Sequence, residues 1–147
     1  MYICVFNYLI TLMGKLFNIS EATNIAIHSL ALISSSKEDL NASQIADMLS
    51  LSKNHLAKIL NILARHKFVT SSRGPKGGFK MLRESGSVSL LEIIELIDGS
   101  LEPDHCRRDD GICPFSDCVF GDVRQRLFDE FKTYYQKRKL TDLSLNY

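Results

Sequence analysis

A basic segment of 32 residues, 52–83, constrains this chain more than any other part of its sequence. It contains no aspartate or glutamate and eight lysine or arginine residues: Lys53, Lys58, Arg65, Lys67, Arg73, Lys76, Lys80 and Arg83. The whole chain of 147 residues has a formal net charge of +1, so the residues outside this segment carry a net charge of −7. Such charge segregation is typical of nucleic-acid-binding proteins, because phosphate contacts supply most of the non-specific affinity for DNA.

The hydrophobic pattern of the same segment predicts a helix that is followed by a β-hairpin. Apolar residues recur at helical spacing, at Leu56, Ile59, Leu60 and Leu63. Phe68-Val69 and the sequence FKML at 79–82 flank the turn-forming sequence RGPKGG at 73–78. A recognition helix followed by a glycine-rich hairpin indicates a winged helix-turn-helix. We therefore predict a mainly α fold with a small β-hairpin wing.

Capping signals predict the helices that surround this segment. A first helix is expected over Ile19–Ser34, with Ser20 as its N-cap. Asn41 and Gln44 form a capping box at the start of a second helix, Ala42–Leu49. Ser50-Leu51 is expected to make the tight turn that follows, and Ser52 is expected to cap the recognition helix.

Two further helices are predicted after the wing. Ser89 and Glu92 have the spacing of a second capping box, which opens a helix over Leu90–Ile97 that Gly99 ends. A long amphipathic helix is expected from Val119 to about Lys139, because its apolar residues step by three or four positions: Phe120, Val123, Leu127, Phe131 and Tyr134.

Length and composition favour a soluble protein of one domain, or of one domain with an appended dimerisation helix. The apolar start, residues 1–13, is shorter than the ~20 residues that a membrane helix needs. It also lacks the basic start and cleavage site of a signal peptide, so we expect a cytoplasmic protein without a membrane partner. This prefix either covers part of the core or precedes a true start at Met13. The predicted division is an extension over 1–13, a DNA-binding domain over 14–100, a cysteine loop over 101–118, and a dimerisation helix with its tail over 119–147.

The helix-turn-helix prediction assigns candidate DNA contacts. A recognition helix presents its amino-terminal residues to base edges in the major groove. The candidates there are Ser52, Lys53, Asn54 and His55, with Lys58 one turn further along. At the wing tip, Arg73 and Lys76 are suited to phosphates or to a narrow minor groove. The alternative is a solvated basic face on a winged-helix module that binds other proteins.

Three of the four cysteines form a second candidate site. Cys106, Cys113 and Cys118 follow His105 and are separated by six and four residues, whereas Cys4 lies alone near the start. Thiolates are the preferred ligands of iron–sulfur clusters and also bind zinc. The segment lacks the paired CxxC spacing of a zinc ribbon, which favours a cluster. A zinc site and three unligated cysteines that form a reversible disulfide remain alternatives.

Together these motifs resemble the Rrf-two family of bacterial transcription regulators, which includes iron–sulfur cluster regulators and nitric-oxide sensors. The resemblance covers residues 13 to about 143 and depends on the combination of RGPKGGF at 73–79, SLLEII at 89–94 and the cysteine triad. It implies a homodimer, held by the long carboxy-terminal helix, that binds a pseudo-palindromic operator. It also implies a cluster, 2Fe–2S or 4Fe–4S, on Cys106, Cys113 and Cys118.

The resemblance also bears on the fourth cluster ligand. Some relatives use a carboxylate from the first helix of the partner subunit, and Glu21 occupies the matching position here. Others use a histidine three residues after the last cysteine, where this chain has Gly121, so His105 is the local alternative. The middle cysteine is displaced by one position from the family spacing. A carboxylate-ligated cluster would react with nitric oxide or oxygen, so the implied role is sensing of redox state, nitric oxide or iron–sulfur status.

An enzyme is not expected. The chain has no evident nucleophile–base pair, its histidines are scattered, and the glycines at 74–78 lack the spacing of a phosphate-binding loop.

Overall fold

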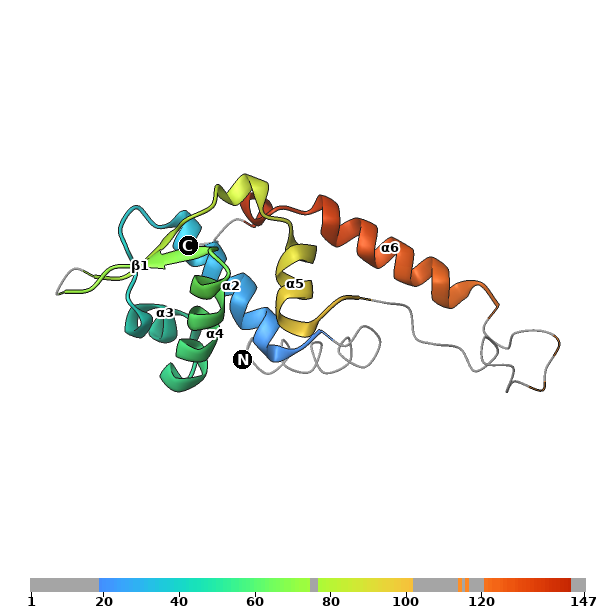
Figure 1. Ribbon diagram of the computed structural model, residues 1–147, viewed down its shortest axis with the longest axis horizontal. Coiled ribbons are helices and arrows are strands. Elements are labelled where there is room, and N and C mark those ends of the chain that lie inside the picture. Colours follow the sequence, from blue (N-terminus) through green and yellow to red (C-terminus); the bar gives the residue numbers. More distant parts are fainter. Residues whose placement is uncertain (1–18, 75–76, 102–113, 115, 117–120, 144–147) are drawn as a thin grey trace.

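The computed structural model describes residues 19–74, 77–101, 114, 116 and 121–143 (Figure 1). The elements along these ranges are α2 (Glu21–Ser35), α3 (Ala42–Leu49), α4 (Lys53–Arg65), β1 (Val69–Ser71), β2 (Phe79–Met81), the 3-10 turn η1 (Ser85–Ser87), α5 (Leu90–Asp98), α6 (Val123–Lys137) and the 3-10 turn η2 (Leu140–Asp142). The described part is mainly helical with one two-stranded antiparallel sheet, which confirms the predicted fold class. None of its helices combines the length and the apolar character needed to cross a membrane.

Local capping chemistry fixes where the first helices begin. The Ser20 hydroxyl accepts a hydrogen bond from the Thr23 amide (3.2 Å), so α2 starts two residues later than the predicted Ile19. The capping box of α3 is confirmed in both directions, because the Gln44 amide donates to Asn41 (2.9 Å) and the Asn41 amide donates to Gln44 (2.8 Å). Each bond satisfies an amide that the helix itself leaves unpaired.

Two predicted caps differ in the structure. Ser52 occupies the N-cap position of α4, but its side chain makes no capping hydrogen bond. Ser89 accepts from the Glu92 amide (3.2 Å), whereas the Glu92 carboxylate binds Arg83 instead of completing the box. Glu92 therefore links α5 to the segment after the wing, a partnership that sequence spacing did not indicate.

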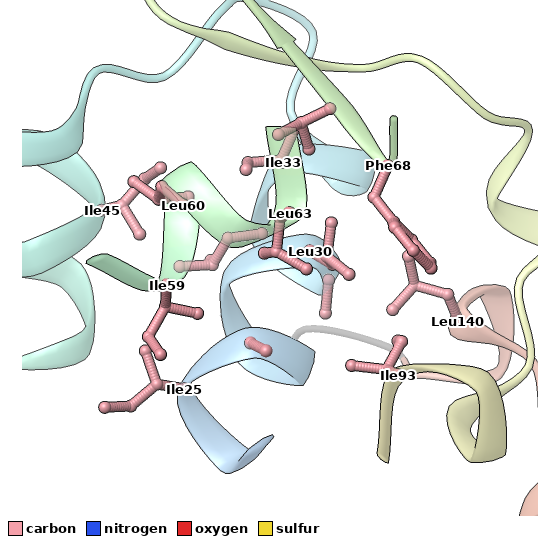
Figure 2. Close-up of a cluster of buried hydrophobic side chains, with 14 of the residues drawn as sticks. Ile25, Leu30, Ile33, Ile45, Ile59, Leu60, Leu63, Phe68, Ile93 and Leu140 are labelled. Atoms are coloured by element: carbon pink, nitrogen blue, oxygen red, sulfur yellow. The ribbon is translucent and has the colours of Figure 1, made fainter. Parts of the chain in front are cut away.

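The apolar faces of the helices meet in one core, where α2 lies between α4 and α5 (Figure 2). The predicted stripe of α4 is buried in full: Leu56, Ile59, Leu60 and Leu63. Leu30 of α2 and Ile93 of α5 are likewise fully buried. Packing of these three helices fixes the side of α4 that faces solvent.

The wing is a short hairpin that is anchored to the loop before α3. Strands β1 and β2 pair with Val69 opposite Met81 and Ser71 opposite Phe79. Phe79 also exchanges backbone hydrogen bonds with Leu40, donating to its carbonyl oxygen (2.8 Å) and accepting from its amide (3.3 Å). The preceding residue, Gly78, is buried so close to this loop that a β-carbon on it would lie 2.8 Å from the Leu40 carbonyl carbon.

The long carboxy-terminal helix extends away from the body, and its carboxy-terminal half packs against α5, where Phe131 is buried (Figure 1). The helix predicted from Val119 to about Lys139 is present over Val123–Lys137. Residues 121 and 122 form a turn, with Gly121 at φ 55°, and Arg138 is extended, so the described helix is shorter than predicted; residues 119 and 120 lie outside the described ranges. After α6, Leu140 donates to the Val88 carbonyl (3.0 Å) and Leu90 donates to the Arg138 carbonyl (2.9 Å). The buried Leu140 thus anchors this end beside the start of α5.

Replacing Gly78 with alanine should destabilise the domain, because the added methyl group meets backbone rather than a flexible side chain. We expect a loss of roughly 1–3 kcal/mol in the free energy of unfolding, as for overpacked sites, measured by urea denaturation. Gly86→Ala is the matched control, since among the described residues a β-carbon there meets a Thr141 methyl group at 3.8 Å and nothing nearer. Equal stability of the two variants would contradict the proposed close approach.

Candidate nucleic-acid interface

Helices α3 and α4 form the helix-turn-helix, and a left-handed residue makes the turn between them. Ser50 has φ 53° and ψ 44°, and its amide donates to the Asp47 carbonyl (3.3 Å). The Leu51 amide donates to the Ala46 carbonyl (2.8 Å), which completes a Schellman motif. The predicted tight turn at Ser50-Leu51 is therefore present, with serine in a conformation that favours glycine.

The recognition helix separates its two faces cleanly. Opposite the buried leucines, Lys53, Asn54 and Lys58 are exposed, as is Ser52 before the helix, whereas His55 is half-buried. Asn61 lies seven residues after Asn54 and is exposed on the same side, so it extends this polar face by one turn. Asn61 was not among the predicted contacts, although helical periodicity alone places it on this face.

The wing supplies a second exposed basic element. Arg73 is exposed where the hairpin turns, and the Gly77 amide donates to the Gly74 carbonyl (2.9 Å) to close that turn. Lys80 of β2 is also exposed. The other predicted contact, Lys76, lies outside the described residues. Arg73 and the exposed side of α4 could together meet the backbone and bases of one duplex.

Arg83, although part of the basic segment, has an internal role. Its guanidinium group forms two contacts with the Glu92 carboxylate, one of them at 3.3 Å, and lies 5.0 Å from the centre of the Phe68 ring. Its charge is therefore paired within the domain. The basic surface thus consists of the remaining exposed cations of the segment. Arg83 instead contacts Glu92 and Phe68 within the domain.

The structure ends α4 with a second Schellman motif, built on lysine. Lys67 has φ 61°, and its amide donates to the Ala64 carbonyl (3.1 Å). The Phe68 amide donates to the Leu63 carbonyl (2.9 Å), and both of these side chains are buried. This motif fixes the direction in which the chain enters β1.

The candidate cluster ligands Cys106, Cys113 and Cys118 lie outside the described residues. Within the described ranges, no group of three or more histidine, cysteine, aspartate or glutamate side chains could hold a metal ion. Glu21 is described and is exposed on the first turn of α2. That turn contacts Asp98, where α5 ends and the chain leads towards the cysteines.

Comparison with protein families gives one match that spans most of the chain. The profile of the Rrf2 (Rrf-two) family, described as "Iron-dependent Transcriptional regulator", matches residues 19–146. BadM of Rhodopseudomonas palustris, provisionally described as an HTH-type transcriptional regulator, is 39% identical over 69 residues, which cover 47% of this chain and 44% of that protein. The chain therefore spans less than half the length of that relative.

Longer matches extend over most of the fold at lower identity. The HTH-type transcriptional regulator IscR of Xenorhabdus nematophila is 21% identical over 130 residues, covering 88% of this chain and 76% of that protein. Among solved structures, CymR, the global cysteine regulator of B. subtilis, has a TM-score of 0.72 at 19% identity and covers 84% of this chain and 93% of its own. IscR of T. potens has a TM-score of 0.65 at 19% identity, covering 84% of this chain and 83% of its own.

Glycine in place of Lys67 should stabilise the domain, because glycine adopts a positive φ without steric cost. We expect a gain of roughly 0.5–1 kcal/mol in the free energy of unfolding. Lys58→Gly is the matched control: the same substitution inside α4 should cost about 1 kcal/mol. Urea denaturation of both variants tests the assignment, and a loss of stability in Lys67→Gly would contradict it.

Proposed function

The chain belongs to the Rrf2 family of transcription regulators, and from this premise we propose that it binds a pseudo-palindromic operator as a homodimer and senses its signal through an iron–sulfur cluster. The relatives named above are transcription regulators and not enzymes. Regulators of this family bind DNA. Such a regulator works where bacterial DNA lies, in the cytoplasm.

One observation carries the DNA-binding part of the proposal: the exposed side of α4 and the wing carries cations, and the basic segment 52–83 that forms both contains no acidic residue. Lys53 and Lys58 of α4 and Arg73 of the wing are all exposed. Asn54 at the start of α4 can donate to and accept from a base edge, and adenine is the base that asparagine pairs with best. Lysine and arginine would contact phosphates and orient the helix in the major groove.

The exposed stripe of α6 supports a homodimer. Val123 and Leu127 are each 45% exposed and Tyr134 is 53% exposed, although all three belong to the apolar stripe of an amphipathic helix. Water contact at three apolar positions of one helix is unfavourable, and a second copy of α6 would bury them. Two recognition helices related by a two-fold axis then match the two half-sites of a pseudo-palindrome.

The proposed cluster site rests on donor chemistry. Cys106, Cys113 and Cys118 supply three thiolates, the ligand type that iron–sulfur clusters use. Glu21 of the partner subunit would complete the set, and its exposure on the first turn of α2 leaves it accessible to another chain. When bound, the cluster would supply a group that can change its redox state and that can react with nitric oxide. A thiol switch or a zinc site is the alternative for the same three cysteines.

Removing one cation from the interface should lower both the affinity for duplex DNA and its salt dependence. For Lys58→Ala, and likewise for Arg73→Ala, we expect the slope of log affinity against log salt concentration to fall in magnitude by about 1. Fluorescence anisotropy with a duplex of arbitrary sequence measures this slope.

Lys137→Ala is the matched control for these variants, because this exposed lysine lies on α6, away from the proposed interface. An unchanged slope in both Lys58→Ala and Arg73→Ala, or an equal change in the control, would refute the assignment of this face to DNA.

Cys113→Ala should abolish cluster binding while leaving the domain folded. Protein purified without oxygen should show thiolate-to-iron charge-transfer absorbance with matching iron and sulfide contents, and the variant should lose both signals. Cys4→Ala serves as the control and should keep them. Full colour and iron in Cys113→Ala would show that the ligand assignment is wrong, whereas a colourless, iron-free parent protein would favour the thiol switch or zinc.

A further inference from the structure

Three acidic side chains of α5 each contact a different part of the fold. Glu92, Glu95 and Asp98 are spaced by three residues along this short helix. Glu92 pairs with Arg83 after the wing, Glu95 lies 3.7 Å from Lys132 of α6, and Asp98 binds the start of α2. Helix α5 is therefore connected through its charged residues to the wing, to the proposed dimerisation helix and to the helix that carries Glu21.

The contact made by Asp98 is the most specific of the three. One of its carboxylate oxygens accepts from the Ser20 amide (3.0 Å) and from the Thr23 hydroxyl (2.8 Å). The Ser20 amide precedes the first turn of α2, where negative charge is favourable. Thr23 is fully buried, so its hydroxyl would be left without this acceptor if Asp98 moved away.

At the other end of α5, Glu92 acts on the wing. Its partner Arg83 lies two residues after β2 and also covers Phe68, the buried residue that ends the Schellman motif of α4. An isolated pair with this degree of exposure contributes little to stability. Its two-point geometry nevertheless relates the orientation of the wing to that of α5.

The chain changes direction immediately after Asp98. Gly99 has φ 90°, a value that glycine adopts readily, and among the described residues no atom beyond its chain neighbours lies within 4 Å of the place where a β-carbon would be. From Gly99 the chain continues through Leu101 towards the segment that contains the three cysteines. Asp98 is thus the last residue of α5 before that segment, and it is where a displacement of the segment would reach α5.

We propose that Asp98 is a positioning residue that transmits the state of the cysteine segment to the DNA-binding face, with α5 as the connecting helix. Movement at Gly99 changes the hydrogen bonds that Asp98 accepts from Ser20 and Thr23 at the start of α2. Helix α2 packs directly against the recognition helix α4. The same movement of α5 reaches the wing through Glu92 and Arg83. This inference rests on the proposed function, since it requires that the cysteine segment has two states.

The test is a comparison of operator affinity with and without the cluster. An operator duplex is obtained by selection from random sequences, and its affinity is measured anaerobically for the cluster-loaded and cluster-free forms. The two wild-type forms should differ by about 5- to 150-fold, the usual range of coupling between sites. In Asp98→Ala this ratio should fall towards 1, and Thr23→Val should act in the same direction.

Two matched variants separate positioning from general loss of stability. Thr23→Ser keeps the hydroxyl group and should keep the ratio. Asp129→Ala removes an acid of α6 whose carboxylate accepts from the side chain of Gln125 (2.9 Å), and it should also keep the ratio. If Asp98→Ala weakened both forms by the same factor, Asp98 would be merely structural and the inference would be overturned.

The outcome for the wild type distinguishes the two proposals. Equal affinities of its two forms would overturn the proposed sensing function and this inference together, whereas a full ratio in Asp98→Ala would overturn the inference alone. Amide hydrogen exchange of the cluster-free protein gives an independent result. Asp98→Ala should raise exchange rates in α4 by about tenfold, as expected for loss of one charged hydrogen bond; an effect confined to the first turn of α2 would contradict transmission.

Discussion

Burial of one side of α4 is the interaction on which the rest of this structure depends. Leu56, Leu60 and Leu63 are completely buried against the helices around them, and each contributes roughly 1.5–3 kcal/mol by leaving water. Because the helix has a fixed period, this burial also determines which residues point outward. Lys53, Asn54 and Lys58 are exposed as a direct consequence. The same leucines that stabilise the domain therefore orient its candidate DNA-binding face.

Those features that depend on neighbours in sequence could be predicted from the sequence. The capping box of Asn41 and Gln44, the N-cap at Ser20 and the end of α5 at Gly99 all follow from local chemistry. The prediction failed for Glu92, because its carboxylate has a stronger partner in Arg83, nine residues away along the chain. Likewise, the charge pattern included Arg83 in the DNA-binding segment, whereas its position shows it paired within the domain.

The candidate site could be predicted only in part, for physical reasons. The exposure of Lys58 follows from helical periodicity and that of Arg73 from turn chemistry, and both patterns can be recognised in a single sequence. The identity of a cofactor depends on how three thiolates and a fourth ligand are arranged in space, and that ligand is proposed to come from a second copy of the chain. The role of Asp98 could not be foreseen at all, because its partners Ser20 and Thr23 lie more than 70 residues away.

We propose that two copies of this chain read DNA through α4 and the wing. Selection of bound duplexes from a random pool, followed by sequencing, tests this proposal. We expect enrichment of an inverted repeat whose half-sites are separated by about one helical turn, 10–10.5 base pairs, or by a multiple of it. Enrichment of a single unrepeated site, or of no sequence at all, would contradict it.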